Sequence, residues 1–198
     1  MTRAHWAVLL FTLGYVAVFS AWFLGTGNTE FLFYVVTMLV LIALVALSWR
    51  KGDYPLPILW ALSLWGLAHM AGGGVPVGDS VLYAAVLVPV VENAEMTILK
   101  YDQAVHAYGF GVTAWLLHHL LVRHYPPARG SLSALAFPAL GAMGLGAVNE
   151  IVEFIAVLAV PETNVGGYVN TALDLVFNAF GACITVAAIH LSGAKTST

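Results

Sequence analysis

The sequence predicts an all-α, polytopic membrane helix bundle of about six transmembrane helices, and two observations predict it. Hydrophobic residues make up 61% of the 198 residues and charged residues only 9%, whereas a soluble globular domain carries about 25% charged residues. Long apolar stretches also recur along the chain, and a helix needs roughly 20 mostly apolar residues to cross a bilayer. We therefore expect most of the protein surface to face lipid.

The apolar stretches divide into six expected spans within one membrane domain, residues 1–198. The third span stops at a run of glycines, and the fifth is long enough to tilt or kink near Pro138. Residues 72–101 form an outer loop. Within this loop the apolar stretch 81–91 is about half a membrane long, so it is either a re-entrant or interfacial segment or part of a structured loop. The expected spans are 5–24, 31–49, 57–71, 102–122, 132–160 and 168–191.

The positive charges predict the orientation of these spans. Cytoplasmic loops of membrane proteins carry an excess of Lys and Arg. If the N-terminus is inside, only Lys100 lies outside, and both termini are cytoplasmic. The positive residues on the inner side are Arg3, Arg50, Lys51, Arg123, Arg129 and Lys195.

Several classes of function are not expected from this sequence. The net charge is −3 and no basic run exceeds Arg50-Lys51, so the sequence does not predict the basic surface that nucleic-acid binding needs. There is no Gly-rich phosphate loop for a nucleotide, and no lysine at mid-membrane depth for a retinal Schiff base. Cys183 is the only cysteine, which excludes an intrachain disulfide and a Cys-based metal site.

Charged and polar residues inside the expected spans are the candidates for function, because burying them in a membrane is costly. They occur at helical spacing on four spans, and a rise of about 1.5 Å per residue places most of them within roughly 10 Å of the outer surface. The fourth span carries Asp102 and His106, and the fifth carries Glu150 and Glu153. The sixth carries Asn170, Asp174 and Asn178, and the third ends near His69.

Four carboxylates at one depth cannot all stay ionised at low dielectric without a cation, protons or water. Three interpretations are therefore open: a divalent metal site, a protonatable polar cavity without metal, and a structural hydrogen-bond network. Asn170 and Asn178 would be further polar members of the site. Haem between His69 and His106 is not expected, because acids surround them. The expected metal ligands are His69, Asp102, His106, Glu150, Glu153 and Asp174.

Two other groups of residues have simpler interpretations. His118, His119 and His124 are expected to form a solvated cluster at the inner surface. Small residues in the fifth span, centred on Gly141, Gly144 and Gly146, allow close helix approach in lipid. They indicate either tight packing within one bundle or the seam of a homodimer.

The polar motifs, in this order, resemble the bacterial YjdF-like inner-membrane family, and the second half also resembles the broader VanZ-like group. The resemblance implies a multi-pass protein of the bacterial cytoplasmic membrane. Three positions depart from the pattern of the YjdF-like family, which usually has Asp at Asn170, Gln at Ala172 and Trp at Phe154. The motifs are Tyr101-Asp102 with His106, Glu150 with Glu153-Phe154, Asn170 with Asp174, Gly181-Ala182, and His69 followed by Gly72 to Gly74.

These observations lead to one main functional hypothesis and two alternatives. The main hypothesis is a metal-dependent enzyme acting on a lipid or lipid-linked headgroup at the outer surface. In it Glu150 or Glu153 is the catalytic base, and Asp102, His106 and Asp174 hold the metal. The alternatives are a small proton- or ion-coupled transporter, and a structural or partner-binding membrane protein.

Overall fold

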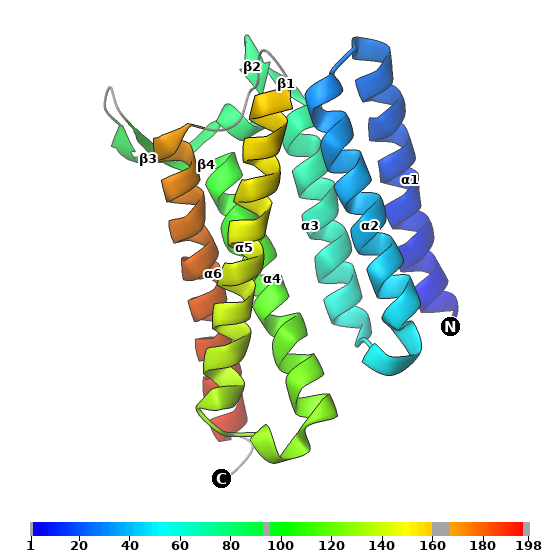
Figure 1. The fold of residues 1–198 in the computed structure, drawn as a ribbon, viewed down its shortest axis with the longest axis vertical. Helices are drawn as coiled ribbons and strands as arrows, with labels where there is room; N and C mark the ends of the chain where they lie inside the picture. The colour runs from blue at the N-terminus through cyan, green and yellow to red at the C-terminus, as the bar shows by residue number, and fades with distance from the viewer. Residues whose placement is uncertain (1, 93–95, 160–166, 196–198) are drawn as a thin grey trace.

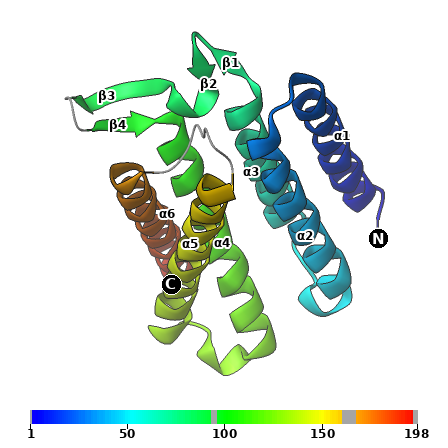
Figure 2. The ribbon, with the colours of Figure 1, turned by 45° about the horizontal axis from the view of Figure 1, so that its top comes forward.

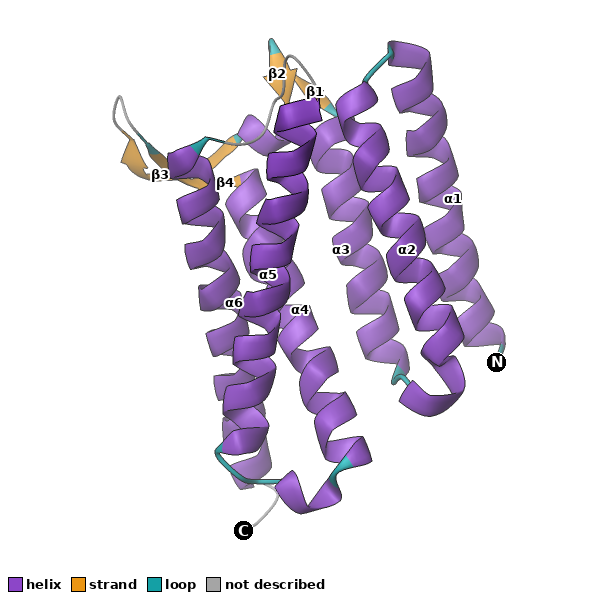
Figure 3. Cartoon of the chain, viewed as in Figure 1, coloured by secondary structure: helices purple, strands orange, loops and turns teal. Residues whose placement is uncertain are grey.

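The structure is a computed structural model that describes residues 2–92, 96–159 and 167–195. Six long helices run alongside one another, and small β-elements lie at one end of the bundle (Figures 1 and 3). The predicted all-α membrane bundle is confirmed. The helices are α1 (Arg3–Thr26), α2 (Thr29–Gly52), α3 (Leu56–Gly74), α4 (Tyr101–His124), α5 (Ser133–Ala159) and α6 (Tyr168–Lys195). Residue 160, the predicted end of the fifth span, lies outside the described residues.

Five of these helices are long and apolar enough to cross a membrane: α1, α2 from Tyr34 onward, α3, α5 and α6. Helix α4 has 24 residues, as many as α1, but it is less apolar. Its first two turns carry Asp102 and His106, and its last turn carries Arg123 and His124. The sixth membrane crossing therefore stays a prediction that depends on how α4 is packed.

Helix α3 continues through three glycines that the sequence analysis expected to end it. A side chain at Gly72 would overlap the ring of Tyr83, and one at Gly74 would overlap the ring of Phe19. The glycines are therefore helical because aromatic rings pack directly on the backbone there. This packing offsets the low helix propensity of glycine.

The helices form two groups of three, α1–α3 and α4–α6 (Figures 1 and 2). Helix α4 packs most extensively against α6, then against α5, and it meets the first group mainly through α3. Large side chains such as Phe23, Met38 and Met70 fill the core of the first group. The core of the second group contains Ala114, Ala139, Ala142 and Ala182, so its helices approach closely.

The outer loop contains two β-hairpins separated by a 3-10 turn. Strand β1 (Pro76–Val77) pairs with β2 (Ser80–Val81), and β3 (Val86–Glu92) pairs with β4 (Thr97–Lys100), both antiparallel. The turn, η1, spans Leu82–Ala84. Of the two structures predicted for the apolar stretch 81–91, it therefore adopts the structured loop, and Pro89 lies in β3. The start of α1 and the end of α6 lie at the opposite end of the bundle (Figure 1).

Candidate metal centre

The first two turns of α4 supply an acid and an imidazole to the candidate site. Asp102 and His106 are four residues apart, so they lie on one helical face. Both are buried, and the His106 Nε2 lies 3.5 Å from Asp102 Oδ1. The helical rise places His106 about 8 Å below the outer end of α4.

Helix α5 brings two further carboxylates to the same imidazole. Glu150 Oε1 lies 3.7 Å from His106 Nδ1, and Glu153 Oε1 lies 4.0 Å from His106 Nε2. Both glutamates are buried, with 6% and 5% of their surface exposed. The Asn149 amide donates a hydrogen bond to Glu153 Oε1 at 2.8 Å, which orients that carboxylate.

Helix α6 contributes the polar stripe that its sequence spacing predicted. The Asn170 amide donates to Asp174 Oδ2 at 2.6 Å, and Asn178 Oδ1 lies 2.9 Å from His106 Nδ1. Asp174 is fully buried. A side chain at Gly146 of α5 would contact the Asn178 amide closely, so this glycine makes room for Asn178.

Three helices of the second group thus place their acids around one histidine. Ligand atoms of Asp102, His106 and Asp174 lie within 4.8 Å of one another, and so do those of His106, Glu150 and Glu153. Both sets consist of buried residues and share His106. Two ligands bound to one metal at about 2.1 Å each are about 3.4 Å apart in tetrahedral geometry. The cluster is therefore slightly wider than a coordination shell and close enough to contract onto an ion.

Several polar atoms of this cluster are buried without a hydrogen-bond partner. Among the described residues these include both carboxylate oxygens of Glu150, Asp174 Oδ1 and Asn178 Nδ2. Buried polar groups are normally hydrogen-bonded, and each exception needs an explanation such as an ion or a water. Here the unpartnered oxygens belong to the same carboxylates that surround His106.

The hydrogen bond to Asn178 fixes the tautomer of His106. An amide oxygen can only accept, so His106 Nδ1 carries the proton and donates it to Asn178 Oδ1. The lone pair is then on Nε2, which faces the carboxylates of Asp102 and Glu153. Metal-bound histidines commonly use this arrangement, in which one ring nitrogen donates to an oxygen and the other binds the ion.

His69 is placed differently from the other expected ligands. It belongs to neither ligand set found among the described residues, although it lines a narrow gap together with His106 and Asn149. The Tyr83 hydroxyl donates to the His69 carbonyl at 2.9 Å and lies 2.7 Å from His69 Nδ1. Because Tyr83 donates its hydroxyl proton to the carbonyl, His69 Nδ1 must donate its own proton to the Tyr83 oxygen. His69 Nε2 then keeps its lone pair.

Tyr83 and Asn149 are site neighbours that the sequence analysis missed. Burial and, next, the negative charge of Asp102 raise the pKa of the Tyr83 hydroxyl well above its usual range, so it stays a donor. Asn149 precedes Glu150 directly and is four residues from Glu153, and that spacing was the available signal. Tyr83 gave no signal, because it lies in an irregular part of the outer loop.

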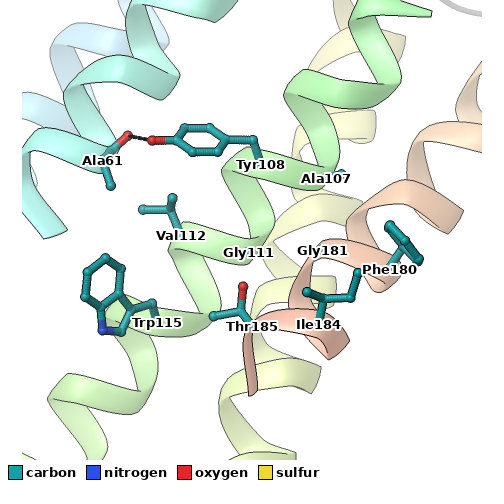
Figure 4. Close-up of a pocket in the computed structure, with 10 residues that line it drawn as sticks. All are labelled: Ala61, Ala107, Tyr108, Gly111, Val112, Trp115, Phe180, Gly181, Ile184 and Thr185. Carbon is teal, nitrogen blue, oxygen red and sulfur yellow. Dashed lines mark hydrogen bonds between the residues drawn. The ribbon is translucent and has the colours of Figure 1, made fainter. Parts of the chain in front are cut away.

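Two other features lie apart from this cluster. His119 Nε2 contacts the Gly52 carbonyl at 3.0 Å, at the other end of α4. An apolar groove of about 500 Å³ lies between α3, α4 and α6, with Ala107, Gly111 and Trp115 along α4 (Figure 4). These three residues lie on a different face of α4 from Asp102 and His106, so the groove does not open into the site.

Comparison with known proteins identifies a family but no characterised relative. No curated protein and no solved structure matches the chain. A family model described as "Predicted membrane protein (DUF2238)" matches residues 7–195. This match includes α1 from residue 7 onward, the other five helices and every residue of the cluster around His106. The chain therefore belongs to this family of multi-pass membrane proteins.

Proposed function

We propose that this protein is a metal-dependent enzyme of the bacterial cytoplasmic membrane, acting on a lipid or lipid-linked headgroup in the outer leaflet. A divalent cation would be held by Asp102, His106, Glu153 and Asp174, with Glu150 beside it. The observation that carries the proposal is the single buried imidazole surrounded by four buried carboxylates on three helices. Hydrogen bonds among the described residues leave several of the carboxylate oxygens without a partner.

The chemistry of the donors favours a cation over a structural network. In a structural network each buried carboxylate oxygen would accept from a donor. In the described residues Glu150 instead has two buried oxygens with no hydrogen-bond partner. Like charges this close at low dielectric need a counter-charge or a proton. Oxygen ligands with one imidazole suit manganese, iron or zinc.

The depth of the cluster favours a headgroup as the substrate. Glu153 lies six residues before the end of α5, and Asp174 lies six residues after the start of α6. Both are therefore about 9 Å from the outer helix ends. The headgroup layer is about 5–8 Å thick on each side of the hydrocarbon, so a helix that ends at the membrane surface places these groups near the boundary between headgroups and hydrocarbon. A bound cation would polarise a phosphoryl or carbonyl oxygen, and Glu150 would accept a proton from the attacking water.

The resemblance to the YjdF-like pattern supports the same residues and also identifies a difference. The pattern usually has Asp at position 170, where this chain has Asn170, whose amide donates to Asp174. An aspartate there would place one more carboxylate beside Asp174. The site of this chain therefore has one carboxylate fewer than the usual pattern. This favours a divalent cation that needs few anionic oxygen ligands over one that needs many, such as Ca²⁺.

The test has two stages that separate binding from catalysis. In the first, protein purified without chelator is analysed for metals, and an anomalous-scattering map locates them. We expect about one divalent ion per chain in the wild type and in Glu150→Gln, and much less in Asp174→Asn and His106→Ala. His118→Ala, at the inner end of α4, is the matched control and should retain the metal. Purified wild type without metal, and without uptake on adding Mn²⁺, Fe²⁺ or Zn²⁺, would refute the metal site.

In the second stage, metal-loaded protein in vesicles is given phospholipids and polyprenyl phosphates, and release of the headgroup is measured. Turnover that Glu150→Gln abolishes supports the enzyme. Metal binding without turnover would favour the second candidate, a small ion-coupled transporter. One observation supports that candidate: the side chains around His106 are almost fully buried, which suits a small ion as cargo. Ion flux in the same vesicles distinguishes the two.

A further inference from the structure

An apolar β-hairpin, β3 with β4, projects from the outer end of the bundle. Leu87, Val88 and Val90 of β3 are 49%, 52% and 62% exposed. Neighbouring residues of a strand point to opposite faces, so both faces of β3 present apolar side chains to the surroundings. Every residue of β3 is exposed, and six of its seven, in the sequence VLVPVVE, are apolar. Such a surface is unfavourable in water.

The hairpin is held firmly at the start of α4, so its position is set by the bundle. Backbone N–H groups of Leu99 and Lys100 donate to Gln103 Oε1 at 2.7 and 3.1 Å, and Gln103 Nε2 donates to the Thr97 carbonyl at 3.2 Å. Gln103 is only 1% exposed. The Tyr101 N–H donates to the Ala85 carbonyl at 2.8 Å. Strand β4 and the residue just before β3 are thus tied to the first turn of α4.

The hairpin leaves the bundle sideways, at the level where α6 begins (Figures 1 and 2). Helix α6 exposes large apolar side chains from its start, since Tyr168 is 89% exposed and Val176 is 61% exposed. Tyrosine at a span end is typical of the interface between membrane and water. The hairpin therefore lies at the level where the exposed side chains of α6 begin (Figure 1).

We infer that this hairpin lies in the outer headgroup layer of the membrane that the helices cross, with lipid as the partner of its apolar residues. It stays in this layer and does not enter the hydrocarbon, because the edge of a two-stranded sheet has backbone groups that need polar partners. Glu92 and Lys100 at strand ends remain in the polar region. This inference does not depend on a metal or on catalysis.

Site-directed spin labelling of the full chain in phosphatidylcholine–phosphatidylglycerol nanodiscs tests the inference. The background is Cys183→Ser, because Cys183 is the only cysteine. Labels are placed through Val88→Cys and Val90→Cys, with Asp79→Cys in the exposed β1–β2 turn as the aqueous control and Val176→Cys as the deep control. We expect the ratio of oxygen to nickel-chelate accessibility at 88 and 90 to lie between the two controls.

Two outcomes would overturn the inference. Ratios at 88 and 90 equal to that at 79 would place the hairpin in water. Loss of collisions with both reagents, together with dipolar broadening between labels, would show that a second copy of the chain covers the strand. Repeating the measurement in nanodiscs that hold one chain each tests for such a second copy, because dipolar broadening between two chains then disappears. Thermal melting of each labelled variant confirms that it is folded.

Discussion

His106 of α4 contacts polar side chains of both other helices in the second group. Its Nδ1 donates to Asn178, and its Nε2 faces the carboxylates of Asp102 and Glu153. A ring that is fixed in this way presents one lone pair in one direction. Asn178 is therefore as important to the proposed site as the acids are, because it determines which nitrogen is available.

Removing the acceptor at Asn178 should weaken metal binding. Partners that orient a metal-bound histidine typically contribute 10- to 100-fold to affinity, so we expect Asn178→Leu to weaken binding by about that factor. Asn178→Asp keeps an acceptor for Nδ1 and should bind at least as tightly as wild type. Titration with Mn²⁺ or Zn²⁺ by calorimetry measures both. If Asn178→Asp lost affinity as Asn178→Leu does, the amide nitrogen would be the group facing His106, and the tautomer assignment would be wrong.

Chelator should lower the melting temperature of the wild type near neutral pH. A ligand that binds only the folded state stabilises it by about 2.7 kcal/mol at a hundredfold excess over its dissociation constant. The effect should shrink under acid conditions, because protonated carboxyl groups bind metal poorly. Asp174→Asn should remove most of the effect, and His118→Ala should not change it. If chelator left the melting temperature of the wild type unchanged near neutral pH, that result would count against the metal.

Most of the site could be predicted from sequence at the residue scale, because a carboxylate within an apolar span is conspicuous. Asp102, Glu150, Glu153 and Asp174 gave that signal directly. His69 gave the same signal, but the structure pairs it with Tyr83 and leaves it outside both ligand sets. Depth along a helix can be counted from sequence, whereas the direction in which a side chain points across to another helix cannot.

At the scale of elements, the close contact between α4 and α6 brings Asp174 and Asn178 to His106. A side chain at Gly181 would overlap the Ala107 carbonyl, and one at Gly111 would lie 3.1 Å from the Gly181 carbonyl. Backbone therefore packs on backbone at this crossing, as small residues allow in membranes. The two helices cannot shift apart without moving the α6 side chains away from the α4 face.

Gly181→Ala should destabilise the bundle by about 1–3 kcal/mol, the usual effect of adding a methyl group to a packed interior. It should also weaken metal binding, since α6 must move away from α4. Gly144→Ala on α5 is the matched control, because a side chain there meets nothing within 4 Å. Melting temperature and metal affinity of both variants check this. Equal stability of the two variants would mean that the α4–α6 contact can relax freely.

The hairpin is the element that sequence reasoning could not specify. A short apolar run fits a strand and a buried helix segment equally well, so 81–91 left two alternatives open. The structure has a strand there, and Pro89 fits it because proline is tolerated on edge strands, where its missing N–H removes no ladder bond. Leu99 adopts a left-handed φ of 73° just before α4, and no sequence pattern signals this turn.

At the scale of the whole molecule, the two groups of three helices have different contents. The first group has an aromatic-rich core, and all residues of the two ligand sets belong to the second. The six helices place the start of α1 and the end of α6 at the same end of the bundle (Figure 1). That arrangement agrees with an even number of crossings, although the membrane orientation itself stays a prediction.

We expect both termini to be cytoplasmic, because six of seven Lys and Arg residues lie on that side. Alkaline phosphatase fused after Lys195 should be inactive, and the same enzyme inserted at Gly78, in the β1–β2 turn, should be active. Green fluorescent protein at the two positions should give the reverse pattern. Phosphatase activity only in the C-terminal fusion would mean that the orientation is the reverse of the predicted one. The carboxylates would then lie near the inner leaflet.

The low apolarity of α4 also has a consequence for how the chain is made. During synthesis α4 emerges before α5 and α6, and polar and charged residues within a lone helix make its transfer into lipid costly. Among the described residues, the carboxylate and amide partners of His106 on other helices come from the last third of the chain. We therefore expect α4 to complete its insertion together with α5 and α6, so that the first three helices insert one by one and the last three as a group.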